Sequence, residues 1–573
     1  MKTNSYLVVS PDDMRSRGWQ QLDVLLLTGD AYVDHPSFPA ALIGRLLADA
    51  GYRVGLLSRP DVTDDEVLRG FGPPRLFVGV TAGALDSMVA NYTALRRPRS
   101  DDPYAPGGKA GGRPDRAVTV YANWVRRVFG SSVFLLAGGI EASLRRFAHY
   151  DYWSNSVRRS VLVDAPLDLI LHGMADDTVI EVARFLDEGR DESLRSSSME
   201  RLRLLAGVTY RLPKGEEAPP DSVEIPGWQR IRQDTGAHIE AWRNQEKQGK
   251  RVLVQENGAV RVVSNPMAPP LSSARLDAVY ALPFSRLPHP MYGNQEIPAV
   301  KQVQFSVTSH RGCAGGCAFC AIHAHQGKIV SSRSPESIEQ EVRSMVANPA
   351  FDGTIRDVGG PSANMFGARC TQESPCSRPS CLSPNRCKHF KTAQDEYCEL
   401  LERVARIPGV KHTFVTTGLR LDLALESSKL VEQVAFHHTS GHLKIAPEHT
   451  VPHVLQTMRK PGGSDFREFV HLFARQTARA HRRQQVIPYL MAAHPGSTLG
   501  DMLDTALFLA EEGIVSEQCQ IFTPTPGTAS TVMYATGVDP ANGEPVFVER
   551  SDHGKRLQKA LLLAHLPDQQ PLV

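Results

Sequence analysis

RGCAGGCAFC, residues 311–320, is the stretch that decides how this sequence is interpreted. It spaces three thiols as C-x3-C-x2-C, at Cys313, Cys317 and Cys320. Three thiolates in one short loop suit a 4Fe–4S cube and leave one iron open to chelate and reduce a small molecule. Gly315 and Gly316 let the backbone fold tightly around such a cluster. The alternative is a zinc or electron-transfer site with a distant fourth ligand, although structural zinc normally takes four protein ligands.

The cysteines are distributed unevenly, and this points to metal chemistry rather than to disulfides. The chain has 9 of them; none precedes Cys313, and all but Cys519 lie between Cys313 and Cys398. A reducing compartment rarely permits disulfides, so such clustering indicates metal or cluster ligation. No apolar run is long enough for a membrane-spanning helix, and the N-terminus turns polar too early for a signal peptide. We expect a cytoplasmic protein that does not interact with membranes.

The overall charge gives no drive towards nucleic acid. The chain has 573 residues, which predicts two or three domains. Its 64 Lys and Arg nearly balance 62 Asp and Glu, for a formal net charge of +2. Binding to nucleic acid is therefore not supported.

The first part of the chain reads as a doubly wound α/β domain over residues 1–191. Fully apolar runs, typical of parallel strands covered on both faces, fall at 24–28, 54–57, 76–80, 133–137 and 167–171, with a helix expected at 40–50. Polar residues follow these strands, where open sheets usually bind ligands. They are either substrate contacts or caps and ion pairs: Asp30, Asp34, His35, Glu141, Arg145 and Arg146.

A region with weaker patterns, 192–300, is expected to connect this domain to a second one at 301–540, followed by a C-terminal segment at 541–573. In the second domain we expect strands at 303–308, 354–358, 412–416, 442–446, 485–490 and 518–522, and helices at 335–346, 426–435, 465–480 and 499–511. Ser334 and Ser464 are candidate N-caps. Six βα-type units predict a curved parallel sheet or incomplete barrel, with its chemistry at the carboxyl ends of the strands.

With these residues in view, the cysteine motif resembles the signature of the radical S-adenosylmethionine (radical SAM) superfamily. The resemblance implies that S-adenosylmethionine binds the open iron and is reductively cleaved to methionine and a 5′-deoxyadenosyl radical, which acts on an unknown substrate. It places Phe319 near the adenine. It also makes Gly359, Gly360 and Pro361 the turn that meets the amino group of S-adenosylmethionine. An electron donor such as flavodoxin or ferredoxin is implied as a partner.

Longer strings narrow the resemblance to the YgiQ family of radical SAM proteins: TGDAYVDHPSF (28–38), GGIEASLRR (138–146), HYDYW (149–153) and KIAPEH (444–449), with residues 306–320. The family implies a cobalamin-binding-like, doubly wound parallel sheet at the N-terminus and a radical SAM partial (β/α)6 barrel. Asp34 and His35 are adjacent rather than spaced as Asp-x-His, so cobalamin is not predicted. The competing class is a non-catalytic iron–sulfur redox sensor or scaffold.

A second cysteine set lies in an insertion at 370–398. Its members Cys370, Cys376, Cys381 and Cys387 are separated by five, four and five residues in a loop rich in Ser, Pro and Arg. A second 4Fe–4S cluster and a structural zinc both suit four thiolates, and free thiols are the third option. His389 and Cys398 are possible substitutes as ligands.

Other candidates follow later strands. Lys444, Glu448 and His449 come after the fourth strand of the second domain and are the predicted catalytic residues; a Glu/His pair can move protons. A purely hydrogen-bonding role is the alternative for them. Residues 417–420 (TGLR) are expected to contact S-adenosylmethionine or substrate, and HPGST (494–498) resembles the fifth-strand turn of methylthiotransferase-like members, with Ser497 in place of Glu.

Overall fold

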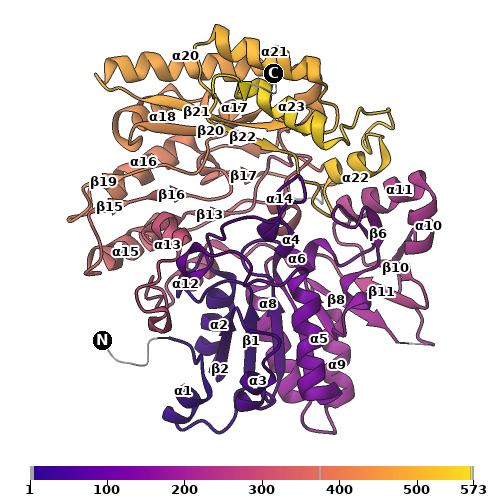
Figure 1. Cartoon of the computed structure of the whole chain (residues 1–573). Helices are drawn as coiled ribbons and strands as arrows, with labels where there is room; N and C mark the ends of the chain where they lie inside the picture. The colour runs from indigo at the N-terminus through magenta and orange to yellow at the C-terminus, as the bar shows by residue number, and fades with distance from the viewer. Residues whose placement is uncertain (1–5, 214, 373–375, 568, 571–573) are drawn as a thin grey trace. The chain divides into compact units, whose positions relative to one another are not determined.

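The computed structural model describes residues 6–213, 215–372, 376–567 and 569–570 (Figure 1). The residues outside this set are 1–5 of the predicted N-terminal domain, 214 of the connecting region, 373–375 of the cysteine-rich insertion, and 568 and 571–573 of the C-terminal segment. The chain forms two compact units. The first takes in the chain up to Pro269 with Leu282–Gln304 and Thr525–Gly527, and the second is built from Pro270–Ala281, Phe305–Pro524 and the chain from Thr528. In the described residues, no helix has the length and apolar character needed to span a membrane.

The first unit is organised around a nine-stranded sheet in the order β2-β1-β3-β4-β7-β8-β11-β10-β9. Its first five members are parallel. They confirm the predicted strands to within two residues at each end: β1 (Val24–Thr28), β2 (Val54–Ser58), β3 (Phe77–Thr81), β4 (Phe134–Ala137) and β7 (Leu169–Leu171). The chain adds β2 on one side of β1 and then β3, β4 and β7 on the other side. The strand order therefore reverses between β1 and β3, which is the switch point of a doubly wound sheet.

Helices cover both faces of this sheet because its central strands are almost entirely apolar. Val24 and Leu26 of β1 pack with α2 (Pro39–Asp49) and α8 (Asp176–Glu188). Leu25 and Leu27 point the other way, towards α3 (Asp65–Phe71) and α5 (Ala117–Phe129). Alternate side chains of a strand face opposite sides of the sheet, so a continuous apolar run is what two covered faces require.

Residues 192–300, predicted from the sequence to be a connecting region, contribute the remaining four strands of the sheet. The strands concerned are β8 (Val208–Leu212), β9 (Val223–Ile225), β10 (Leu253–Asn257) and β11 (Val260–Ser264). β8 runs antiparallel to β7 and to β11, and β10 antiparallel to β11. These strands are short and carry polar residues, so their hydrophobic pattern is too weak to place them in a sheet from sequence alone.

The second unit is the predicted partial barrel of βα units. Its strands pair in parallel and in chain order, and a parallel bridge between Leu419 and Ile445 links the two halves of the run. The strands are β12 (Ser306–Thr308), the interrupted pair β15 (Thr354–Ile355) and β16 (Asp357–Gly359), β19 (His412–Thr413), β20 (His442–Glu448), β21 (Gln485–Ala492) and β22 (Gln518–Ile521). The helices between them include α15 (Pro335–Val346), α16 (Gln394–Ala405), α18 (Ser428–Gln433), α20 (Gly463–Arg479) and α21 (Leu499–Glu511).

Side chains of these strands divide between the core and the opposite face. Leu443 and Ile445 of β20 are buried in the cluster that contains Phe466 and Phe469 of α20. Lys444, between them, is exposed and therefore lies on the other face of the strand. The C-terminal helix α23 (Asp552–Leu562) joins the same core through Leu562.

One predicted helix start is wrong. Ser464 lies within the first turn of α20, whose N-cap is Gly462. A Cβ on Gly463 would lie 2.4 Å from the carbonyl oxygen of Thr450, so the helix begins where the backbones approach closely and only glycine fits. Ser334, in contrast, is the N-cap of α15, and its hydroxyl accepts the Ser337 N–H at 3.1 Å.

These two serines provide a matched pair of substitutions. Ser334→Ala removes a capping hydrogen bond and should lower the free energy of unfolding by about 1 kcal/mol. Ser464→Ala removes an exposed hydroxyl with no capping role and should change it by less than about 0.5 kcal/mol. Urea denaturation followed by circular dichroism measures both; equal effects would contradict the assignment of the helix starts.

Candidate active site

The cysteine loop lies between β13 (His310–Arg311) and α14 (Ala321–Gln326) and is fixed mainly through its backbone. The Cys313 N–H donates to Gly327 O at 3.1 Å, and the Ala318 N–H donates to Met458 O at 2.9 Å. Gly312 has φ +81°, and a Cβ there would lie 2.0 Å from Ile329 O. Because most residues of the loop are small, these backbone contacts determine where the three thiols lie.

The three cysteines are half-buried beside positive charge. Burial raises the pKa of Cys313, and it raises that of Cys320 to about 12. A thiolate at such a site needs a metal or a cation to form. Arg420 supplies one cation: its Nη1 lies 3.8 Å from Cys317 Sγ, and Asp422 holds the guanidinium at 2.9 Å. Burial opposes the charge on Arg420, but Asp422 and the thiols of Cys317 and Cys313 raise its pKa.

These residues fit a 4Fe–4S cluster better than a single metal ion. Among the described residues, no three His, Cys, Asp or Glu side chains converge so as to hold one ion. Thiolates of a 4Fe–4S cluster bind different irons, so their sulfurs stay apart. Gly315 leaves the space that Arg420 occupies, since a Cβ there would lie 2.6 Å from Arg420 Nη1.

The glycine turn predicted to meet S-adenosylmethionine lies directly beside this loop. β16 ends at Gly359 and pairs with β12, and the Gly359 carbonyl accepts the Ser309 N–H at 2.7 Å. A Cβ on Gly360 would lie 2.6 Å from the His310 ring and 2.8 Å from its carbonyl oxygen. Pro361 follows and is half-buried. The turn is therefore packed against the residues that lead into Cys313.

Phe319 contacts the turn after β21. Its ring meets that of His494 edge to face, with 6.0 Å between centroids, and His494 in turn meets Phe522 at 5.2 Å. Burial lowers the pKa of His494 to about 3, so its imidazole is neutral. His494 Nε2 is 2.7 Å from Ser530 Oγ. The fifth- and sixth-strand ends are thus brought to the aromatic residue that precedes Cys320.

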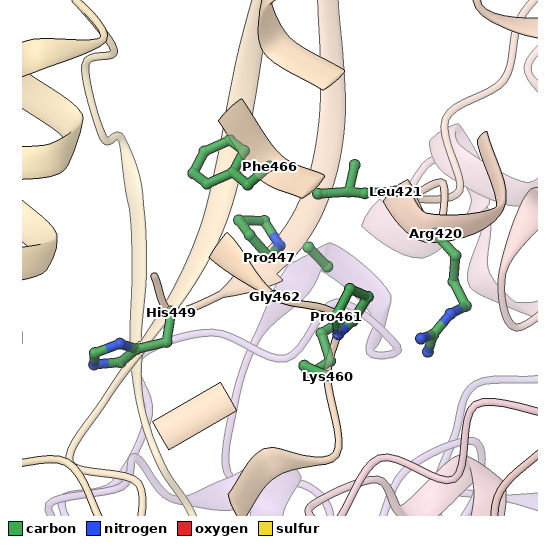
Figure 2. A pocket seen from close by; sticks show the side chains of 9 residues that line it. Arg420, Leu421, Pro447, His449, Lys460, Pro461, Gly462 and Phe466 are labelled. Carbon is green, nitrogen blue, oxygen red and sulfur yellow. The ribbon is translucent and has the colours of Figure 1, made fainter. Parts of the chain in front are cut away.

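A pocket opens next to Arg420 in the same unit (Figure 2). The pocket is lined by Arg420, Leu421, Ala446, Pro447, His449, Lys460, Pro461, Gly462 and Phe466. Glu448 lies at its edge in an ion pair with Lys460, 3.7 Å away, and has φ +68° in a non-glycine residue, a strained conformation. Burial raises the pKa of Glu448, and Lys460 lowers it.

Of the predicted catalytic residues, His449 has both ring nitrogens engaged. Its Nδ1 accepts the Val451 N–H at 3.1 Å and lies 3.2 Å from Thr505 Oγ1, while Nε2 lies 3.2 Å from Ser497 Oγ. Burial lowers the pKa of His449 to about 4. Lys444 is exposed on β20. Their catalytic roles stay predictions.

The second cysteine set lies against the first. Cys381 is buried in a cluster with Ala314 and Phe390, against which Cys313 and Cys387 also pack. Cys370 is exposed on β17 (Arg369–Cys370). All nine cysteines are free thiols.

The crevice at the switch point of the first unit is filled by the chain's own side chains. Arg113 is wholly buried there, 2.9 Å from Asp30 and 3.2 Å from Asp102, and Arg59 is 2.8 Å from Asp102. Burial raises the pKa of Asp30 to about 6, although Arg113 opposes the rise. Asp30, which follows β1, is therefore engaged in a buried ion pair.

Asp34 and His35 are also committed to structural contacts. Asp34 is paired with Arg45 at 2.6 Å and accepts the Ser285 N–H at 2.8 Å. His35 Nε2 is 2.9 Å from Arg286 Nη1 and is buried. The Nε2 atom of His35 is thus engaged by Arg286.

Three family models match the chain. The model described as Radical SAM N-terminal matches residues 6–306, and that of the Radical SAM superfamily matches 307–509. A domain of unknown function (DUF3362) matches 517–573. Fold and cysteine loop together therefore define a radical SAM enzyme.

Two relatives specify the family. A UPF0313 protein of Geobacter sulfurreducens is 45% identical over 573 residues, covering 99% of this chain and 93% of that protein. A UPF0313 protein of Methanocella arvoryzae is 43% identical over 572 residues, covering 99% and 94%. The chain belongs to the UPF0313 family, the YgiQ family that the sequence motifs predict.

The fold is also found among solved structures. The chain is similar to TsrM, a radical SAM methyltransferase of Kitasatospora setae whose structure holds cobalamin and a 4Fe–4S cluster. The TM-score is 0.50 at 14% identity, covering 90% of this chain and 78% of that one. The likeness confirms the predicted fold class and extends no further.

Sequence reasoning missed Lys460 as a site residue and mentioned Arg420 only within a candidate segment. Lys460 precedes Pro461 and Gly462 in the loop between α19 (Pro452–Met458) and α20. A Lys-Pro-Gly-Gly turn between two helices is the signal that could have drawn attention to it. Neither residue lies near a cysteine in the sequence.

The close packing of the glycine turn can be tested with a second matched pair. Gly360→Ala places a methyl group against the His310 ring and backbone and should cost about 1–3 kcal/mol of stability through overpacking. Gly418→Ala meets only Lys444 O, at 3.9 Å, and should change stability by less than about 0.5 kcal/mol. Thermal unfolding of the metal-free chains measures the difference; a Gly360→Ala protein as stable as wild type would contradict the packing.

Proposed function

We propose that Cys313, Cys317 and Cys320 bind a 4Fe–4S cluster and that the enzyme reductively cleaves S-adenosylmethionine. The cluster supplies the single electron that converts S-adenosylmethionine to methionine and a 5′-deoxyadenosyl radical. The observation that carries the proposal is the loop itself: three half-buried cysteines within one tight turn, with the Arg420 guanidinium 3.8 Å from Cys317 Sγ. Family membership supports the same chemistry.

The chain's own residues would bind and orient S-adenosylmethionine. The glycines at 359 and 360 allow close backbone approach of its amino group, with Pro361 ending the turn. Phe319 offers a ring face or edge to the adenine and is held by His494. Arg420 and Lys460 provide positive charge near the loop, where a carboxylate would be stabilised.

A redox sensor or scaffold is less well supported than an enzyme. Such a protein needs only the cluster. The match of residues 307–509 to the Radical SAM superfamily supports the enzyme instead.

The proposal predicts cluster-dependent cleavage. Anaerobically reconstituted and reduced with dithionite, the wild-type chain should release 5′-deoxyadenosine from S-adenosylmethionine, measured by chromatography. Cys313→Ala removes a cluster ligand and should abolish the product, and Cys398→Ala, which changes a buried cysteine of α16, should retain it. Product from Cys313→Ala equal to that of wild type would refute the proposal.

On the substrate side, we propose that Glu448 handles protons, that Lys444 contacts the substrate, and that His449 positions the loop after β20. Glu448 is suited to this because burial raises its pKa while Lys460 lowers it. A group balanced in this way can both accept and donate a proton. His449, which is neutral and hydrogen-bonded at both nitrogens, is suited to holding Ser497 and Thr505 in place.

The pairing of Glu448 with Lys460 makes a prediction about pH. Lys460→Met removes the cation that lowers the pKa of Glu448, so the limb of the pH profile that reflects Glu448 should move to higher pH. Glu448→Gln should lose that limb. The measurement is 5′-deoxyadenosine formation against pH, and superimposable profiles for wild type and Lys460→Met would show that Glu448 does not titrate in this reaction.

The electron donor and the cellular compartment are also parts of this proposal. A low-potential donor such as flavodoxin or ferredoxin would deliver the electron, in the cytoplasm. TsrM is a methyltransferase with cobalamin bound. We do not extend methyl transfer through cobalamin to this chain, because a likeness at 14% identity concerns the fold alone.

A further inference from the structure

The loop that carries the second cysteine set is packed onto the backbone of the first. The Cys381 N–H donates to Ala314 O at 3.0 Å, and Ser380 Oγ donates to Gly315 O at 2.7 Å. A Cβ on Gly316 would lie 2.8 Å from Pro379 O and 2.8 Å from Ser380 Cβ. The glycines of the first loop therefore accommodate the second loop as well.

Internal hydrogen bonds hold the second loop in a compact form. The Cys387 N–H donates to Cys381 O at 2.8 Å, and the Phe390 N–H donates to Cys387 O at 3.0 Å. Cys370 is paired with Phe390 between β17 and β18 (Phe390–Lys391). Lys328 Nζ donates to Cys376 O at 3.0 Å, which anchors that cysteine to the end of the first loop. All four cysteines are thus placed by neighbouring backbone contacts.

The surroundings of these thiols are basic. Residues 370–391 contain Arg378, Arg386, Lys388 and Lys391 against one acidic residue, Glu373, and Arg386 is paired with Glu426. Lys328 Nζ also donates to Arg378 O at 2.6 Å, so its ammonium group lies beside this loop. Four thiolates with an iron–sulfur core carry net negative charge, which such a loop stabilises.

We propose that Cys370, Cys376, Cys381 and Cys387 bind a second 4Fe–4S cluster, through which the first cluster receives its electron. The role in electron delivery rests on the proposed function; the metal site does not. Cys370 is exposed and Cys381 is buried against Ala314, so the set leads from the surface to the first loop. One electron from a low-potential one-electron donor enters at the second cluster and passes to the first, and no bond forms or breaks.

A structural zinc fits the geometry less well. Zinc needs its sulfurs around one point, each about 2.3 Å from the metal. Over the described ranges, no such convergence of three or more donors exists at either cysteine set. Cys398 is buried in the hydrophobic core with Tyr397 and Leu401, so it is not a ligand.

Metal content tests the site independently of catalysis. Full-length chains are reconstituted anaerobically with iron and sulfide, and iron, sulfide and zinc are measured together with Mössbauer spectra. The wild type should hold about eight irons, and Cys376→Ala/Cys387→Ala should hold about four. A Cys313→Ala/Cys317→Ala/Cys320→Ala protein, which leaves only the second set, should also hold about four. Cys398→Ala is the matched control and should equal wild type.

A second readout tests the electron path. Cleavage of S-adenosylmethionine is driven either by dithionite or by reduced flavodoxin, and the ratio of the two rates is compared. In Cys376→Ala/Cys387→Ala this ratio should fall by at least about tenfold relative to wild type and to Cys398→Ala. An unchanged ratio would overturn the role in electron delivery.

The outcomes separate the two proposals. One zinc per chain, lost in Cys376→Ala/Cys387→Ala, or a Cys313→Ala/Cys317→Ala/Cys320→Ala protein without iron would overturn the second cluster even if S-adenosylmethionine is cleaved. About eight irons with no 5′-deoxyadenosine would support the second cluster and count against the proposed function.

Discussion

Backbone hydrogen bonds to a loop of small residues are the constraint on which the second unit depends. Ala318 is bonded on both sides, through its N–H to Met458 O at 2.9 Å and through its carbonyl to Ser530 N at 3.0 Å. Ala314 O accepts from Cys381 N. The loop has almost no large side chains with which to anchor itself, and its buried polar groups must all find partners. The residues that supply them, Met458, Ser530 and Cys381, therefore fix where the thiols lie.

Burial of this loop disfavours charge on its thiols, and a cationic side chain far away in the sequence offsets that effect. Buried thiols favour the neutral form, and a buried cation favours an anionic partner. Arg420 meets both needs because its guanidinium lies between Cys317 and Asp422. Its backbone N–H donates to Asn364 Oδ1 at 2.9 Å, which fixes the start of this segment. Lys460 is balanced in turn by Glu448. The charges near the loop thus come from segments that follow β19 and β20 and not from the cysteine motif itself.

The sequence predicts those features that a local pattern determines. Continuous apolar runs predicted β1 to β4, and the helix 335–346 was predicted to the residue because Ser334 and a regular apolar face define it. The place of Gly359 and Gly360 followed from strand order. Lys460 and the contact of Phe319 with His494 could not be predicted, because they depend on how separate loops approach one another. Ser464 failed for the same reason: the contact of Gly463 with Thr450 sets that helix start.

The first unit shows why a shared fold does not determine a ligand. Its strand order provides a crevice between β1 and β3, where doubly wound proteins commonly bind cofactors. Here Arg113 occupies that crevice, and its burial is balanced only because Asp30 and Asp102 both contact it. Gly83, at φ +110°, leaves room for the Asp30 carboxylate, which would lie 2.2 Å from a Cβ. Because the glycine, the carboxylates and the arginine depend on one another, opening the crevice would expose a buried charge network, and the side chains rather than the sheet decide what it holds.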